Sequence, residues 1–218
     1  AFAVSPDGTK LAYSLDVEGA EVYTIYIKDL TDQVIYTESI ENTFSSVYYR
    51  TGVEWANDNQ TIFYLTLDAA QRPYGVWSHK LGTAVSEDRL FFQEDDETYT
   101  LYIYKTRDDA YILSSHHSTR TTEVRFISAD QPDSEWKILS PRTDGVEYFA
   151  WHHEGFFFIN TNLEAKNFRL MKASVDQPTI EQWIEVIPHR EDVLLEWVDS
   201  FKYHIVLYER QNGLRQIR

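Results

Sequence analysis

The chain has 218 residues, 43% of them apolar and 25% charged, so it is long enough to bury a sizeable core in one large domain or two small ones. Its 35 acidic and 20 basic side chains give a formal net charge of −15, which repels nucleic-acid phosphates and anionic membranes and attracts cationic partners. The absence of cysteine excludes disulfides and cysteine nucleophiles, and it fits a cytoplasmic protein. No apolar run approaches the roughly 18 residues of a membrane-spanning helix. We therefore expect neither nucleic acid nor a membrane as a partner.

Short apolar runs alternate with polar turns from the first residue onward. The first unit reads AFAVS, KLAYSLD, EVYTIYIKDL and QVIYTESI, and the second reads GVEWA, TIFYLTL, YGVWSHKL and DRLFFQE. Runs of this length, rich in Val, Ile, Tyr and Phe and separated by turns such as SPDG and NDNQ, predict strands. Corresponding units cover about residues 1–42, 52–95, 98–142, 145–188 and 193–218, and the last of them has only three strand-like runs.

Bulky residues recur at one position of these units. Trp151 and Trp197 lie 46 residues apart in the first run of their units, Trp55 precedes Trp151 by 96 residues, and Val4 holds the matching place in the first unit. Such a repeat predicts a side chain that packs one unit on the next.

Several runs are apolar on both faces, for instance residues 156–159, which predicts sheets covered on both sides by neighbouring sheets. A four-stranded unit repeated every 45–51 residues is typical of a β-propeller. The predicted fold is all-β: a single partial propeller over residues 1–218, with four four-stranded blades and three strands of a fifth. The segment PTIEQWIEVI, residues 178–187, is either a helical turn or an irregular entry into a strand.

The motifs of common enzyme sites are missing. The chain contains no Gly-x-Ser-x-Gly elbow, no Gly-x-Gly-x-x-Gly fingerprint and no phosphate loop ending in Gly-Lys-Ser/Thr. Adjacent histidines on a strand point to opposite faces, so the pairs His116–His117 and His152–His153 suit hydrogen bonding better than binding of one metal ion. We expect no cofactor, no metal site and no catalytic residue in this chain.

The densest acidic run is Glu94-Asp95-Asp96-Glu97. It is a solvated connection between two units, a negative rim that attracts basic peptides, or a calcium site, although no glycine follows at the spacing of a calcium loop. Among these readings, attraction of a basic substrate is the candidate function for Glu94, Asp95, Asp96 and Glu97.

Long stretches of the chain resemble the propeller of oligopeptidase B, in the prolyl oligopeptidase family of serine peptidases. They include AVSPDGTKLAYSLD, VEWANDNQTIFYLT, RPYGVWSHKLGT, FFQEDDETYTLYIYKTR, SSHHSTRTTEVRFISAD, EVIPHREDVLLE and ERQNGLRQIR. The similar segments follow one another in order along the whole chain. Strings such as RPYGVWSHKLGT are long and specific, unlike the common SPDG turn.

The resemblance implies a seven-bladed propeller that limits peptide access to a C-terminal α/β-hydrolase domain, which carries Ser, Asp and His and cleaves after Arg or Lys. None of these three catalytic residues has a counterpart here, so we expect the chain alone to be inactive. We also expect a propeller cut at both ends, with uncovered blade faces that promote self-association. The alternative is a free-standing propeller scaffold that binds peptides or proteins.

Overall fold

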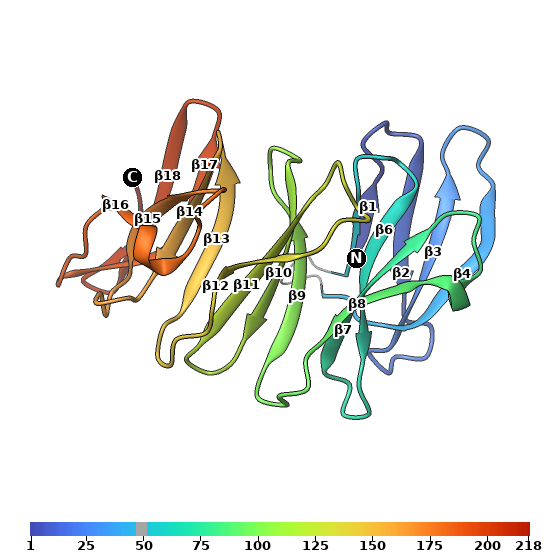
Figure 1. Ribbon diagram of the computed structural model, residues 1–218, viewed down its shortest axis with the longest axis horizontal. Coiled ribbons are helices and arrows are strands. Elements are labelled where there is room, and N and C mark those ends of the chain that lie inside the picture. The colour runs from blue at the N-terminus through green and yellow to red at the C-terminus, as the bar shows by residue number, and fades with distance from the viewer. Residues whose placement is uncertain (47–51) are drawn as a thin grey trace. The chain divides into compact units, whose positions relative to one another are not determined.

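The computed structural model describes residues 1–46 and 52–218, which form nineteen strands and two short 3-10 helices (Figure 1). The chain divides into two compact units, residues 1–119 with 125–137 and residues 120–124 with 138–218. Within the described residues, no helix is long and apolar enough to cross a membrane. The all-β class predicted from the sequence is confirmed.

The first unit begins with two antiparallel meanders. Their strands are β1 (Phe2–Val4), β2 (Lys10–Leu15), β3 (Tyr23–Asp29), β4 (Ile35–Thr43), β5 (Val53–Trp55), β6 (Thr61–Leu67), β7 (Pro73–Lys80) and β8 (Arg89–Gln93), with a 3-10 helix at Val85–Glu87. One residue pair, Thr43 with Thr66, joins the two meanders into a single sheet. The join arises because the end of β4 runs beside β6, where the amide of Phe44 donates to the carbonyl of Leu65 over 2.9 Å.

Three further sheets follow. With the two joined meanders counted as the first and second sheets, the third has the order β12-β11-β10-β9, the fourth β13-β14-β15-β16 and the last β17-β18-β19. Their strands are β9 (Thr100–Lys105), β10 (Tyr111–His117), β11 (Thr122–Ser128), β12 (Lys137–Ser140), β13 (Tyr148–His153), β14 (Phe156–Thr161), β15 (Arg169–Ser174), β16 (Ile184–Ile187), β17 (Val193–Phe201), β18 (His204–Gln211) and β19 (Leu214–Ile217). The segment after Pro178 forms a 3-10 helix at Ile180–Gln182 and then enters β16, so both readings of PTIEQWIEVI describe part of it.

The turns between the first and second strands of the four-stranded units share one backbone feature. A residue near the end of each turn takes a positive φ: Gly8 at 73°, Asn59 at 59°, Asp109 at 58° and Gly155 at 82°. In the turn before β14 the preceding residue, Glu154, does so as well, at 48°. Gly, Asn and Asp adopt this conformation with the least strain, which explains why the four turns share no single sequence but draw on the same few residues.

The core of the first unit lies on both sides of β6. Ile62 and Tyr64 pack with residues of the first meander, including Ile25 and Ile27. Their neighbours along the strand, Phe63 and Leu65, point the other way and pack with residues of the third sheet, among them Leu101, Ile103 and Ile112. A strand buried on both faces is what continuous apolar runs predict, because side chains alternate along the strand.

The tryptophan side chains at the recurring position pack against other sheets in two of three cases. Trp55 is 1% exposed, and its indole N–H donates to the carbonyl of Ala3 over 3.0 Å. In the second unit Trp151 packs against a cluster of Leu170, Leu195, Val198 and Leu207. Trp197, in contrast, is 44% exposed and borders a groove.

Candidate functional site

The acidic run Glu94–Glu97 forms the start of the connection from β8 to β9, and its four carboxylates do not share one environment. Glu94 is buried, whereas Asp95, Asp96 and Glu97 are exposed. Asp95 accepts a hydrogen bond from the Gln93 side chain over 2.7 Å. Asp96 accepts hydrogen bonds from the backbone and hydroxyl of Thr98, over 3.0 and 2.7 Å. The outward negative charge of this segment therefore comes from residues 95–97.

Glu94 faces the third sheet. One of its carboxylate oxygens lies 2.9 Å from Nδ1 of His116 on β10, and the other accepts the backbone N–H of Asp96 over 3.1 Å. His116 is completely buried and stacks on the ring of Phe92, with 5.2 Å between the ring centroids. The carboxylate thus ties the acidic connection to the protein interior, where solvent and peptides do not reach it.

Nε2 of the same histidine lies 3.4 Å from Oγ of Ser114, so Ser114, His116 and Glu94 have the connectivity of a serine-hydrolase triad. Ser114 and His116 are both 0% exposed, so no substrate carbonyl can approach the hydroxyl. The hydroxyl–imidazole distance is also long for proton transfer, which requires about 2.6–3.2 Å. This constellation stabilises the fold and is not a catalytic site.

The next residue, His117, ends β10. Burial, together with the neighbouring charge of His116, lowers the pKa of His117 to about 4. At neutral pH it is therefore an uncharged imidazole. Among residues 1–46 and 52–218, no group of three His, Cys, Asp or Glu side chains is placed to hold a metal ion.

A second buried polar cluster, which the sequence did not indicate, lies between β6, β7 and the residue before β8. Asp88 accepts the hydroxyl of Tyr64 over 2.8 Å and lies 2.6 Å from Nδ1 of His79. Both members of the His79–Asp88 pair are almost fully buried. Burial and the Asp88 carboxylate raise the pKa of Tyr64. Nothing in the local pattern SEDRL distinguishes Asp88 from an exposed turn residue, because its partners lie 9 and 24 residues away.

Glu54, at the middle of β5, is a further acidic group and is partly buried. Burial raises its pKa to about 8, although the backbone N–H and the positive charge of Lys105 on β9 act in the opposite direction. The Lys105 ammonium donates to the side chain of Asn57 over 2.6 Å, so it is shared with a second partner. Glu54 therefore binds a proton at neutral pH in the folded protein.

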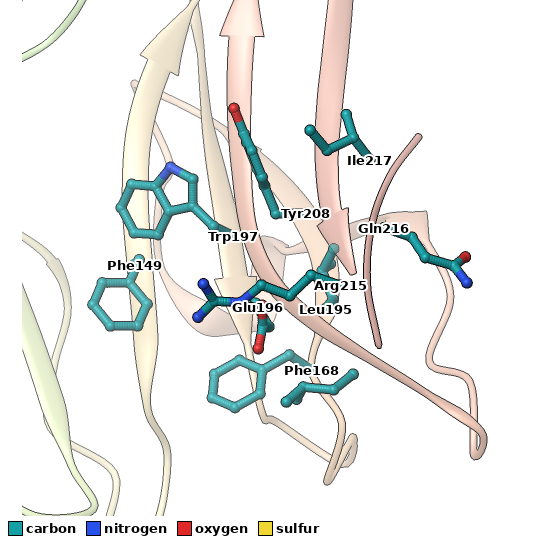
Figure 2. Close-up of a pocket in the computed structure, with 10 residues that line it drawn as sticks. Phe149, Phe168, Leu195, Glu196, Trp197, Tyr208, Arg215, Gln216 and Ile217 are labelled. Atoms are coloured by element: carbon teal, nitrogen blue, oxygen red, sulfur yellow. Dashed lines mark hydrogen bonds and ion pairs between the residues drawn. The ribbon is translucent and has the colours of Figure 1, made fainter. Parts of the chain in front are cut away.

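The second unit contains an open groove with a volume of about 710 Å³ (Figure 2). Aromatic rings from three strands and one turn line it: Phe149, Phe168, Trp197 and Tyr208. The rings of Phe149 and Trp197 meet edge to face with 5.6 Å between centroids. Glu196 at its side is paired with Nε of Arg210 over 2.7 Å and with Nε of Arg215 over 3.1 Å. The groove offers aromatic surface and compensated charges, and no nucleophile paired with a base.

The comparisons with known proteins agree with this all-β architecture. Residues 1–218 match the sequence family described as "Prolyl oligopeptidase, N-terminal beta-propeller domain". Protease 2 of Moraxella lacunata is 34% identical over 214 residues, and dipeptidyl aminopeptidase BI of Pseudoxanthomonas mexicana is 32% identical over 219 residues. These alignments cover 98% and 100% of this chain but only 30% and 29% of the two relatives.

Two solved structures give the same result. Oligopeptidase B from Leishmania major superposes with a TM-score of 0.91 at 28% identity, and oligopeptidase B from Trypanosoma brucei, with covalently bound antipain, with a TM-score of 0.87 at 26% identity. Each covers all of this chain, which in turn covers 30% of each structure.

Four-stranded antiparallel meanders that repeat along the chain, and that pack face on face within each unit, define a β-propeller domain, and the fold prediction is confirmed. The chain belongs to the family of N-terminal propeller domains of prolyl oligopeptidases. The resemblance to oligopeptidase B seen in the sequence is confirmed as well.

Proposed function

We propose that the chain is the substrate-gating propeller portion of an oligopeptidase B-like serine peptidase, whose catalytic Ser, Asp and His lie on a C-terminal α/β-hydrolase domain. The observation that supports this most is the match of the whole chain to peptidase propellers, while it spans about 30% of the relatives' length. In this proposal the propeller limits access to peptides of modest length, and the hydrolase domain is its main partner. The protein works in the cytoplasm without a cofactor.

The substrates in this proposal are peptides cleaved after Arg or Lys. The net charge of −15 and the exposed carboxylates of Asp95, Asp96 and Glu97 support the attraction of such peptides, because a field of one sign raises the local concentration of the opposite charge. The names of the relatives differ, since one is a dipeptidyl aminopeptidase. Cleavage after Arg or Lys is therefore a separate part of the proposal, which the names alone do not support.

The ionic strength dependence of kcat/KM for the full enzyme and a dibasic peptide tests the attraction. We expect kcat/KM to fall between low and physiological salt, because screening weakens exposed charges. The triple variant Asp95→Asn/Asp96→Asn/Glu97→Gln should show a smaller fall than the wild type. Equal salt dependence in both proteins would remove these three residues from the proposal.

The chain by itself should hydrolyse no peptide. Turnover of an arginine-ended fluorogenic substrate by the pure 218-residue chain, blocked by a serine-directed inhibitor, would contradict the proposal.

A second candidate, a free-standing propeller scaffold, is favoured by the exposed apolar residues at the first and last sheets. Phe2 is 75% exposed and Ile217 is 72% exposed. Such surfaces bind other chains, and for the isolated chain we propose self-association through them. Light scattering that shows only monomer at high protein concentration would refute self-association. A reading frame that continues past Arg218 into a Gly-x-Ser-x-Gly motif would refute the scaffold.

A further inference from the structure

The connection from β8 to β9 is held by one side chain from the preceding sheet. Arg72 lies at the end of the turn between β6 and β7, and its side chain is 13% exposed. Its Nη2 donates to the carbonyl of Glu94 over 3.0 Å, and its Nη1 to the carbonyls of Tyr99 and Asp96 over 2.7 and 3.3 Å. One guanidinium therefore binds both ends and the middle of the segment 94–99.

The same guanidinium is also bound by a carboxylate of its own turn. Nε of Arg72 donates to the carboxylate of Asp68 over 2.9 Å, and that carboxylate also accepts the backbone N–H groups of Ala70 and Arg72. A largely buried cation is tolerated only when its charge and its N–H groups have partners. The planar fork of arginine meets this need with several acceptors at once, which lysine does not reproduce.

The opposite side of the segment is held by the third sheet. The buried carboxylate of Glu94 faces His116, and its second oxygen accepts the N–H of Asp96. The backbone is thus bound by Arg72 from the second sheet, and the Glu94 side chain is bound by His116 from the third. Between these two anchors the chain turns so that residues 95–97 are exposed.

The second unit contains a weaker version of this arrangement. Asn167, which precedes β15 as Arg72 precedes β7, donates to the carbonyls of Arg190 and Glu191 in the connection from β16 to β17, over 3.0 and 2.8 Å. In the turn between β10 and β11, Arg120 pairs instead with Asp144, and both side chains are well exposed. An exposed pair of this kind contributes little to stability. Arg120 is therefore a matched control for Arg72.

We infer that Arg72 is a positioning residue, which fixes the path of the connection 94–99 so that Glu94 is held inside against His116 while Asp95, Asp96 and Glu97 are held outside. This inference deepens the proposed attraction of basic peptides and, for that consequence, rests on the proposed function. The clamp itself depends only on the contacts of Arg72 and Glu94.

Amide hydrogen exchange of the 218-residue chain tests the clamp, with the amides of Asp96, Thr98 and Tyr99 as probes. Each of these amides donates a hydrogen bond within the connection. In Arg72→Gln we expect their exchange to rise at least about tenfold. The segment 94–99 then opens without breaking the charge-assisted hydrogen bonds that the Arg72 guanidinium makes in the wild type. Exchange in β14 should stay unchanged, and Arg120→Gln should exchange as the wild type does at all these positions.

Arg72→Lys keeps the charge but loses the fork, so it should give exchange between the wild type and Arg72→Gln. If Arg72→Gln does not fold, Arg72→Lys decides the matter. Wild-type protection of residues 96–99 in either folded variant would overturn the inference, as would an equal rise throughout the chain. If the clamp variants loosen the segment as expected but the triple carboxylate variant leaves the salt dependence of kcat/KM unchanged, the positioning role stands and the proposed attraction fails.

Discussion

Substitution of Glu54 by Gln should remove a pH dependence of stability that this one carboxyl group creates. Burial raises the pKa of Glu54 from an ordinary value of 4.5 to about 8. Between these two values the unfolded chain has released the proton and the folded chain still binds it. Folding therefore takes up a proton, and stability falls as the pH rises from about 4.5 to about 8.

The size of the effect follows from the shift. Each pH unit between the two pKa values costs about 1.4 kcal/mol, so the wild type should lose about 2–3 kcal/mol of stability through Glu54 between about pH 6 and pH 9. Gln keeps the size and hydrogen-bonding capacity of the protonated carboxyl group and does not titrate. The advantage of Glu54→Gln over the wild type should therefore grow by the same amount over this range.

Urea unfolding of both proteins at several pH values, followed by tryptophan fluorescence, measures this difference. Glu18→Gln is the control, because Glu18 lies exposed in the turn before β3 and its substitution should leave the wild-type pH dependence intact. Parallel stability curves for the wild type and Glu54→Gln would show that the carboxyl group titrates normally and would refute the argument from burial.

Three further substitutions test the packing. Asp88→Asn should cost about 2–4 kcal/mol in urea unfolding, because Asp88 serves both Tyr64 and His79 inside the protein; a cost below about 0.5 kcal/mol would contradict this role. Gly75→Ala should cost about 1–3 kcal/mol, since an added Cβ would lie 2.6 Å from the Thr66 hydroxyl and 2.9 Å from the Trp77 indole nitrogen, and a neutral effect would mean that the Trp77–Thr66 hydrogen bond is not needed. At Gly155, where φ is 82°, Val should be about 1–2 kcal/mol less stable than Asn, and equal thermal midpoints would argue against the left-handed turn.

The strands and turns could be predicted because their signals are local. Alternating or continuous apolar runs define the strands, and the turns at Gly8, Asn59, Asp109 and Gly155 draw on residues that tolerate a positive φ. The stacking of sheets on both faces of β6 follows from its unbroken apolar run. These features depend on neighbours within a few residues, so they can be predicted from a single sequence.

The inner half of the candidate site could not be predicted in this way. Four acidic residues in a row indicate an exposed segment, yet Glu94 is buried because His116, 22 residues later, provides its partner. Arg72 also lies 22 residues before Glu94, and no local pattern connects them. The single residue pair between Thr43 and Thr66 likewise depends on how two sheets meet.

The most direct test is to express the complete reading frame that contains this chain and to compare it with the 218-residue chain on arginine-ended and proline-ended fluorogenic peptides, with and without a serine-directed inhibitor. We predict that the complete protein cleaves the arginine-ended peptide far faster than the proline-ended one, that the inhibitor stops it, and that the chain alone cleaves neither. Cleavage by the chain alone, or a complete protein that prefers the proline-ended peptide or cleaves no peptide, would contradict the account.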